Sequence, residues 1–295
     1  MQAKPAIQPF FLDDQGCKLF AVYYQPPAKQ QVEKIIIHIP AFADEMNKAR
    51  RMVSSQAREF AKQGYGVLVL DLFGTGDSEG SFSEATWAIW KQNIKAAYTW
   101  ACQQGATSVS LWSLRSGALL AMDFVAESHA KINTLLAWQP VLNGELFIMQ
   151  FLRLRVAAAM MDKQAPQEKT ADLKQQLLDG SAVEVAGYLL NSKLVTPLIG
   201  LSVNDMSLST ITRIRFFELV TSEDKPVTAI TTHFIEDRCN KNQDASFTKV
   251  VGSAFWSAQE IVEVPELLSA TVVALKSTIK DFSGFSTMQL RVVNA

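Results

Sequence analysis

Short apolar runs alternate with amphipathic stretches along the first half of the chain. The runs are rich in β-branched and large apolar residues, which is typical of strands buried on both faces of a parallel sheet. The stretches between them place apolar residues at helical spacing. The pattern predicts strands at 34–39, 66–72, 108–112 and 134–138, and helices at 48–63, 86–103 and 116–126. This alternation predicts a parallel sheet covered by helices on both faces.

The chain begins with a different pattern. Residues 10–12 and 18–24 are strand-like runs on either side of a turn sequence, Asp13-Asp14-Gln15-Gly16. The glycine suits a turn position with positive φ. These runs predict a β-hairpin, and Pro26-Pro27 ends it.

The strand rhythm stops after 138. Residues 143–205 contain helical stretches, at 145–161 and 171–178, but no buried strand pattern. We interpret about 141–210 as a helical cap inserted over the carboxyl edge of the sheet. The pattern then resumes, with strands expected at 213–220 and 247–251 and helices at 227–239 and 265–279. We expect the 295 residues to form one α/β domain with a cap insertion.

Composition excludes several classes of protein. Lys plus Arg number 28 and Asp plus Glu 29, whereas nucleic-acid-binding proteins carry a basic excess. No apolar run approaches the roughly 20 residues of a membrane span, and the N-terminus lacks the apolar core of a signal peptide. Three scattered cysteines form neither a disulfide framework nor a metal site. The sequence also lacks the Walker and dinucleotide-binding fingerprints. From these observations together we expect a cytoplasmic protein without a cofactor or a nucleic-acid partner.

A glycine-rich turn follows the second buried run. Residues 71–80 (DLFGTGDSEG) have the spacing D-x-x-G-x-G-x-S-x-G. With the opening hairpin, the parallel sheet and the inserted cap, this turn resembles the α/β-hydrolase superfamily; an ordinary glycine-rich βα loop is the alternative. The resemblance implies the α/β-hydrolase fold: a mostly parallel twisted sheet with helices on both faces and a helical cap. Ligands of such sheets bind at the carboxyl ends of the strands.

The third strand end corresponds to the nucleophile turn of that superfamily. There a strained strand-to-helix turn carries the nucleophile between small residues, because strand and helix backbones approach closely. In Ser113-Leu114-Arg115-Ser116-Gly117, the small residues Ser113 and Gly117 bracket Arg115. Placing Ser113 or Ser116 at the nucleophile position would put a large side chain at a crowded position. The spacing therefore places Arg115, which stays protonated at neutral pH, where the nucleophile is expected.

Enzymes of this superfamily use a catalytic triad of nucleophile, acid and base. By resemblance, the acid and base positions align with Asp224 and Phe255. Residues 221–227 (TSEDKPV) resemble the superfamily's acid turn, G-x-x-D-x-x-V, with Asp224 as the acid; a charged surface turn is the alternative. Residues 251–256 (VGSAFW) resemble its loop G-x-x-H-[FW], with Phe255 at the base position. None of the three histidines fits that position: His38, His129 and His233.

The loop after the first buried run corresponds to the oxyanion loop. Hydrolases commonly have His-Gly there, whereas this chain has His38-Ile39-Pro40. Proline has no N–H to donate. The backbone amides of Phe42 and Ser116 are the remaining candidate donors to an oxyanion.

Several blocks resemble one subgroup more closely. The blocks are 42–52, 111–121, 138–145 and 255–261. They are similar to the exosortase A system-associated hydrolase 2 family, whose members are encoded near bacterial exosortase and exopolysaccharide genes. The resemblance implies a hydrolase label and a genomic setting, and no known substrate. Because fold does not fix function, the function depends on the site.

The first functional hypothesis is a binding protein. Arg115 at a helix N-terminus would form a carboxylate or phosphate site, and Phe42, Glu45 and Lys48 are candidates to line it. The ligand would be a small molecule or an anionic lipid-linked glycan, and the partner a component of the exosortase or exopolysaccharide machinery. The structural alternative is an Arg115 that fills a dead pocket, paired with Asp224 or Glu45, because buried charges must be paired.

The second hypothesis is an enzyme. A carboxylic-ester or thioester hydrolase could use a displaced nucleophile, Ser113 or Ser116, with an unconventional base. A third, weaker hypothesis concerns the cap helix at 145–161, whose apolar residues and arginines would suit a membrane surface. Helical periodicity favours a cap packed on the core instead.

Overall fold

The computed structural model describes residues 4–27, 32–161, 168–276 and 290–293. Within these ranges one nine-stranded sheet has the order β1-β2-β4-β3-β5-β6-β9-β10-β11, and only β2 runs against the other strands. The strands are β1 (Ala6–Asp14), β2 (Cys17–Gln25), β3 (Lys34–Ile39), β4 (Gly66–Leu70), β5 (Ser108–Leu114), β6 (Ile132–Trp138), β9 (Ile211–Val220), β10 (Asp244–Val251) and β11 (Leu290–Val293). The predicted fold class is therefore confirmed.

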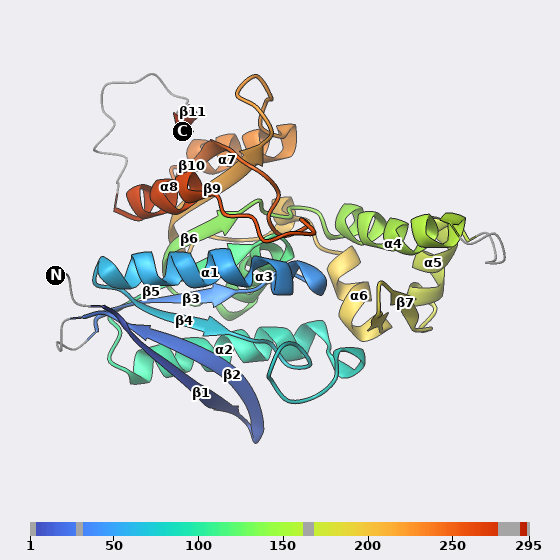
Figure 1. Cartoon of the computed structure of the whole chain (residues 1–295), viewed down its shortest axis with the longest axis horizontal. Coiled ribbons are helices and arrows are strands. Elements are labelled where there is room, and N and C mark those ends of the chain that lie inside the picture. The colour runs from blue at the N-terminus through green and yellow to red at the C-terminus, as the bar shows by residue number, and fades with distance from the viewer. Residues whose placement is uncertain (1–3, 28–31, 162–167, 277–289, 294–295) are drawn as a thin grey trace.

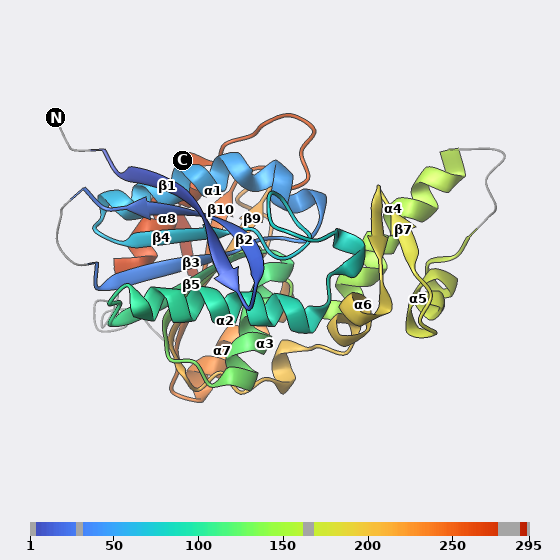
Figure 2. The ribbon, with the colours of Figure 1, turned by 90° about the horizontal axis from the view of Figure 1, so that it is seen from below.

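Helices cover both faces of this sheet (Figure 2). One face is covered by α1 (Asp44–Lys62) and α8 (Pro265–Lys276), and the other by α2 (Trp87–Gln103), α3 (Ser116–Ser128) and α7 (Ala229–Asn240). Strand β3 shows why both layers form. Ile35, Ile37 and Ile39 join the core on the α2–α3 side, whereas Ile36 joins the core under α1. Successive side chains point to opposite faces, and a strand buried on both faces must be apolar throughout.

The cap lies at one end of the sheet (Figure 1). It comprises α4 (Gly144–Met161), α5 (Thr170–Leu178), β7 (Val183–Val185), β8 (Tyr188–Leu190) and α6 (Ser192–Ile199). The prediction that this region holds no strand is wrong, because β7 and β8 form an antiparallel hairpin. Each strand has only three residues, which is too short to show a period, and Ala186 and Gly187 turn between them with φ of 50° and 83°.

Polar contacts attach the cap to the body. The Asn191 side chain donates from Nδ2 to the carbonyl oxygens of Ser83 (2.8 Å) and Ala85 (2.7 Å). Its Oδ1 accepts from the amide of Leu194 at 3.0 Å and so caps α6. Asn47 of α1 also donates to the hydroxyl of Tyr188 at 3.3 Å. The cap is therefore bonded to two segments of the body, helix α1 and the loop that contains Ser83 and Ala85.

Helix α4 contacts the body through two phenylalanines and also carries exposed leucines. Phe147 and Phe151 pack edge-on against Phe42 of the body, at ring-centroid distances of 5.7 and 5.2 Å. Leu146 and Leu154 of the same helix are exposed. None of the helices in the described parts of the chain is long and apolar enough to cross a membrane.

Element boundaries differ from the prediction mainly at exposed ends. Strand β1 begins at Ala6 rather than at residue 10, because its first four residues are exposed and show no alternation. Helix α1 begins at Asp44, four residues before the predicted 48. The predicted helix at 265–279 is described as far as Lys276, and its last residues lie outside the described ranges. Strand β11, which pairs with β10, was not predicted.

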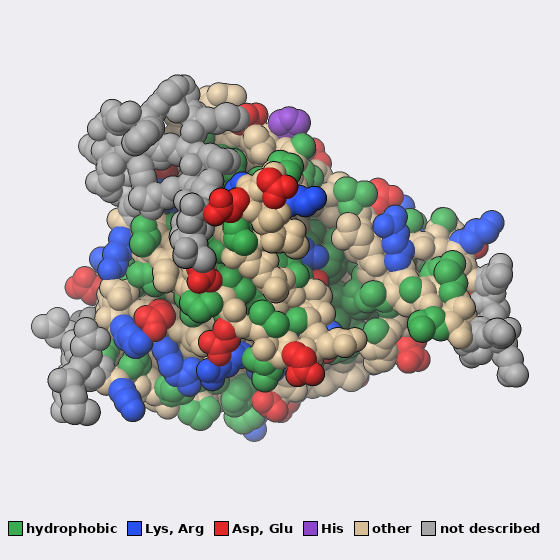
Figure 3. Space-filling model, turned by 45° about the horizontal axis from the view of Figure 1, so that its top comes forward, with side chains coloured by type: hydrophobic (Ala, Val, Ile, Leu, Met, Phe, Trp, Pro, Cys, Tyr) green, Lys and Arg blue, Asp and Glu red, His purple; other side chains and the backbone are tan. Residues whose placement is uncertain are grey.

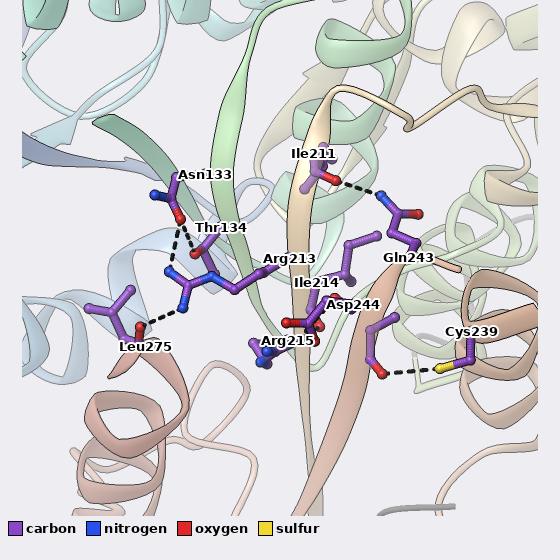
Figure 4. A network of polar contacts seen from close by, with 11 residues as sticks. Asn133, Thr134, Ile211, Arg213, Ile214, Arg215, Cys239, Gln243, Asp244 and Leu275 are labelled. Carbon is purple, nitrogen blue, oxygen red and sulfur yellow. Dashed lines mark hydrogen bonds and ion pairs between the residues drawn. The ribbon is translucent and has the colours of Figure 1, made fainter. Parts of the chain in front are cut away.

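A polar network joins β6, β9 and β10 at their amino ends (Figure 4). Arg213 donates from Nη2 to Oδ1 of Asn133 at 2.8 Å and from Nη1 to the carbonyl oxygen of Leu275 at 3.2 Å. Arg215, which is buried, forms an ion pair with Asp244 at 2.6 Å. Burial, with Arg215 nearby, lowers the pKa of Arg213. The network lies at the sheet edge opposite the carboxyl ends, so we interpret it as structural.

Candidate functional site

The turn between β5 and α3 is strained at Arg115. Its backbone angles are φ 55° and ψ −123°, a region that residues other than glycine rarely adopt. The Arg115 amide donates to the carbonyl oxygen of Trp138 at 2.9 Å, and its own carbonyl accepts from Val141 at 3.1 Å. These bonds to the end of β6 hold the turn. The structure thus places Arg115 on a sharp strand-to-helix turn, the arrangement that carries the nucleophile in α/β-hydrolases.

The residues around this turn are small because space is lacking. A Cβ on Gly117 would lie 2.6 Å from the carbonyl oxygen of Ile39 and closer still to that of Pro40. Ser113 is fully buried within β5, and its hydroxyl donates to the carbonyl oxygen of Leu136 at 3.2 Å. Ser116 begins α3 and is 4% exposed. Both serine side chains therefore lie within the packed protein.

Three elements hold the Arg115 side chain. Its Nε donates to Oε1 of Glu45 in α1 at 3.1 Å, and its Nη1 donates to the carbonyl oxygen of Gln139 at 3.5 Å. The guanidinium also lies over the ring of Trp256, 5.4 Å from the centroid. The Arg115 side chain is 18% exposed to solvent. Arg115 is thus fixed in one orientation with part of its guanidinium open to solvent.

Glu45 is the counter-ion of Arg115. Burial raises the pKa of Glu45, and Arg115 acts against that rise by its charge and its hydrogen bond. The second carboxylate oxygen of Glu45 is buried and has no hydrogen-bond partner in the described structure. Lys48, which the sequence also placed at the site, is paired with Asp44 at 3.0 Å. Of the two predicted partners of Arg115, the structure shows Glu45.

The loop after β4 lies against α1. The Asp71 carboxylate accepts from Nη2 of Arg50 at 3.0 Å and from the amide of Asp77 at 3.1 Å. Ser78 donates from its hydroxyl to the carbonyl oxygen of Asp71 at 2.6 Å. Gly76 has φ 55°, and a Cβ there would collide with the Asp71 carboxylate. The motif residues therefore build a rigid loop through contacts with one another.

Phe255 and Asp224 are not brought together in the described structure. Phe255 is 1% exposed and packs edge-on against Trp138 at 5.8 Å. Asp224 lies in the exposed turn after β9, where a hydrogen bond from Ser222 lowers its pKa. Phe255 has no titratable group that could exchange a proton with Asp224, so these two residues form no acid–base pair.

The histidines lie away from the strained turn or cannot take up a proton there. His38 is 3% exposed, and its Nδ1 lies 3.1 Å from the carbonyl oxygen of Trp112. Burial lowers the pKa of His38 from 6.5 to about 3. His129 ends α3 in the left-handed conformation, and His233 is exposed on α7.

The candidate oxyanion donors lie at the same sheet edge. Phe42 is buried among aromatic rings that include Phe82 and Trp90. In the part of the chain that the structure describes, the amides of Phe42 and Ser116 donate to no other group. Figure 3 shows hydrophobic side chains in a hollow where the cap meets the body. The structure therefore offers amide donors and apolar surface at this edge.

Two residues at the site were missed by the sequence analysis. Gln139 has φ 42°, and its Oε1 accepts from the amide of Leu219 at 2.7 Å, which turns its carbonyl toward Arg115. Trp256, not Phe255, contacts the guanidinium. The aromatic position that follows the histidine in the superfamily loop was a signal for Trp256. Gln139 had none, because its role depends on a positive φ.

Comparison with known proteins agrees with this architecture. Residues 15–146 match the family described as X-Pro dipeptidyl-peptidase (S15 family). None of the curated proteins matches the sequence. The fold is similar to Est1E of Butyrivibrio proteoclasticus with bound ferulic acid, at a TM-score of 0.61 and 17% identity over 92% of this chain and 99% of that one.

Two further solved structures are similar. XC6422 of Xanthomonas campestris, described as an α/β serine hydrolase without lid, has a TM-score of 0.57 and 12% identity over 97% of this chain and 99% of its own. An α/β serine hydrolase homologue of Coxiella burnetii has a TM-score of 0.54 and 12% identity over 91% and 97%. Together with the sheet order and the strained turn, these similarities show that the chain has the α/β-hydrolase fold.

Proposed function

We propose that this protein is a non-hydrolytic relative of the α/β-hydrolases that binds an anionic small molecule at Arg115. One observation carries the proposal: an arginine, held by three elements, occupies the strained turn where the fold presents its nucleophile. A strained conformation of a non-glycine residue costs on the order of 1–3 kcal/mol and persists where the surroundings determine it. The turn is thus kept although its side chain is no nucleophile.

The residues at the expected base position also support the proposal. Nucleophilic catalysis needs a hydroxyl or thiol beside a base. Phe255 carries no base, and His38 is buried and hydrogen-bonded to the backbone. The displaced-serine alternative finds little support, because Ser113 lies fully buried in its strand. These features favour binding over acyl transfer.

Arg115 retains donors for an anion. A guanidinium has five N–H donors, and here one is directed at Glu45 and one at Gln139. In the described structure Nη2 has no partner. The N-terminus of α3 lies directly after Arg115, and its dipole favours negative charge. A carboxylate or phosphate group is the ligand chemistry that fits these donors.

The biological ligand is proposed from the sequence resemblance. Exosortase-associated proteins are encoded beside exopolysaccharide genes, and anionic lipid-linked glycans contain both carboxylate and phosphate groups. The hydrophobic hollow beside the cap would suit an apolar portion of such a molecule (Figure 3). We therefore propose an anionic intermediate of exopolysaccharide assembly as the ligand, with the exosortase machinery as partner.

Hydrolysis is tested with p-nitrophenyl esters of graded acyl length and a serine-reactive phosphonate. We expect the purified protein to hydrolyse none above the buffer rate and to remain unlabelled. Turnover that disappears in Ser113→Ala or Ser116→Ala would establish the hydrolase alternative and overturn the proposal. An Arg115→Ser variant should also remain unlabelled, because no base lies beside the turn to activate the new hydroxyl.

Binding is tested by titrating the full chain with dimethyl phosphate and with acetate. The indole N–H signal of Trp256 in NMR reports on the site, because this ring lies against Arg115. We expect saturable shifts in the natural protein and at least tenfold weaker binding in Arg115→Gln. Arg153→Gln, which changes an exposed arginine of the cap, is the matched control and should bind normally. Equal binding by Arg115→Gln would exclude Arg115 as the ligand site.

A further inference from the structure

Arg115 and two basic side chains in the first turns of α1 are already paired with carboxylates. The pairs are Arg115–Glu45 at 3.1 Å, Lys48–Asp44 at 3.0 Å and Arg50–Asp71 at 3.0 Å. Lys48 is close enough to Glu45 to affect its ionisation. The candidate site is therefore a set of neutral pairs and not a pocket with surplus positive charge.

Glu45 is the carboxylate that a ligand on Arg115 would meet. It occupies the Nε edge of the guanidinium, and only 21% of its side chain is exposed. A ligand anion on the Nη edge would lie within about one guanidinium width of this carboxylate. At such distances, and away from bulk water, charges still interact strongly. Glu45 therefore acts against every negative charge that the ligand carries.

A singly and a doubly charged ligand are affected differently. The first negative charge can be balanced by the three N–H donors of Arg115 that remain open. A second charge gains less, because its attraction to Arg115 is largely cancelled by its repulsion from Glu45. Removing a dianion from water also costs more free energy than removing a monoanion, and nothing at the site offsets this difference. The balance thus favours a monoanion.

We propose that Glu45 is a specificity-determining residue that makes the Arg115 site prefer singly charged groups, namely carboxylates and phosphodiesters, over phosphomonoesters. The inference rests on the proposed function, since it describes the ligand of the same site. It narrows the ligand to a glycan acid or to a phosphate already esterified on two sides.

The test compares two probes that differ by one charge. At pH 8 dimethyl phosphate is a monoanion, whereas methyl phosphate is largely a dianion, because its second pKa lies near 6. The natural protein should bind dimethyl phosphate about tenfold more tightly, as measured by the Trp256 indole signal. This measurement needs no variant, so it does not depend on the folding of a mutant.

The variant Glu45→Gln should remove the preference. We expect its affinity for methyl phosphate to rise at least tenfold more than its affinity for dimethyl phosphate. Asp44→Asn, which removes the same charge one residue earlier in α1, should leave the ratio of the two affinities within twofold. Circular dichroism checks that both variants are folded.

The outcomes separate this inference from the proposed function. Arg115 can be required for binding while Glu45→Gln leaves the ratio of the two affinities unchanged, or while Asp44→Asn changes that ratio equally. In either case Glu45 does not determine specificity, so this inference is overturned and the proposed function stands. If neither probe binds the natural protein or Glu45→Gln, both the proposed function and the inference are overturned.

Discussion

Two residues adopt the same strained backbone conformation at neighbouring strand ends. Ala43, after β3, has φ 53° and ψ −130°, and Arg115, after β5, has φ 55° and ψ −123°. Strands β3 and β5 are paired along their length, so the two turns lie side by side at the carboxyl edge. Each turn leads directly into a helix. A strained residue therefore precedes each of the two helices at this edge of the sheet.

Single buried groups also make stability depend on pH, and His38 is the clearest case. Burial lowers the pKa of His38 from 6.5 to about 3, so between these values the unfolded chain binds a proton that the folded chain does not. The contribution of neutral His38 is complete above pH 6.5 and is lost as the pH falls toward 3. Between pH 7.5 and pH 5 this loss is about 2 kcal/mol.

Urea unfolding at the two pH values measures this loss. Between pH 7.5 and pH 5, we expect the free energy of unfolding of His38→Asn to fall by about 2 kcal/mol less than that of the natural protein. His233→Asn, at an exposed histidine, should follow the natural protein. The same pH dependence in His38→Asn and the natural protein would show that burial does not hold His38 neutral.

The sequence was informative about single residues where steric rules apply. The small residues Ser113 and Gly117 located the turn at Arg115, because strand and helix leave no room for larger side chains there. The contacts of Arg115 depend on other segments. The choice between Glu45 and Asp224 as its partner stayed open, since it requires the position of α1 relative to the turn.

At the scale of elements, α3 is positioned by its close approach to the end of β3. Gly117→Ala should lower the free energy of unfolding by about 3 kcal/mol, because its Cβ would meet two backbone carbonyls that cannot rotate away. Gly200→Ala is the control: its Cβ would meet nothing closer than 3.5 Å, so we expect a change within about 0.5 kcal/mol. Urea unfolding compares them, and equal effects would contradict the packing.

The attachment of the cap depends on one asparagine. Asn191→Ala removes a helix cap and leaves two carbonyl oxygens without their donors, so we expect a loss of about 2–3 kcal/mol. Asn240→Ala, at an exposed position of α7, should change stability little. Urea unfolding measures both. A loss below about 0.5 kcal/mol in Asn191→Ala would show that these bonds do not hold the cap.

Elements with a sustained period were predictable, and short ones were not. The buried strands and long helices of the body repeat their pattern over five residues or more. The β7–β8 hairpin has three residues a strand, and β1 is largely exposed, so neither carries a full period. Their formation depends on pairing with a partner strand.

At the scale of the whole molecule, cap and body share one hydrophobic core. Phe42 of the body and Phe147 of the cap belong to the same cluster of buried residues, which also contains Leu173 and Leu194. The prediction of one domain with an inserted cap therefore has a direct physical consequence. Because the two parts bury each other's apolar surface, neither should unfold alone.

Unfolding followed by two probes tests this prediction. All six tryptophans lie outside 141–210, so their fluorescence reports on the body, whereas circular dichroism reports on every helix. We expect the two urea transitions to coincide in the natural protein. Phe42→Ala, which removes the ring between body and cap, should lower stability by about 3–5 kcal/mol. Separate transitions in the natural protein would show that the cap is an independent unit.

The overall architecture was predictable because it follows from the order of elements. Alternating strands and helices allow few parallel sheets, and the handedness of βαβ connections restricts them further. The meeting of loops at the carboxyl edge was predictable for the same reason. Which side chains meet there was predictable only in part, because it depends on loop conformations such as that of Gln139.

The bonds that hold the turn at position 115 all come from backbone atoms. The amide and carbonyl bonds to the end of β6, and the close approach of Gly117 to the end of β3, involve no side-chain atom of residue 115, so a residue with a backbone N–H can make them. The backbone conformation at position 115 therefore does not depend on contacts of its side chain. Serine and arginine codons can differ by a single nucleotide, so one mutational step exchanges these two residues at 115 while the backbone bonds of the turn stay available. The same independence makes position 115 a starting point for engineering new nucleophiles into this fold.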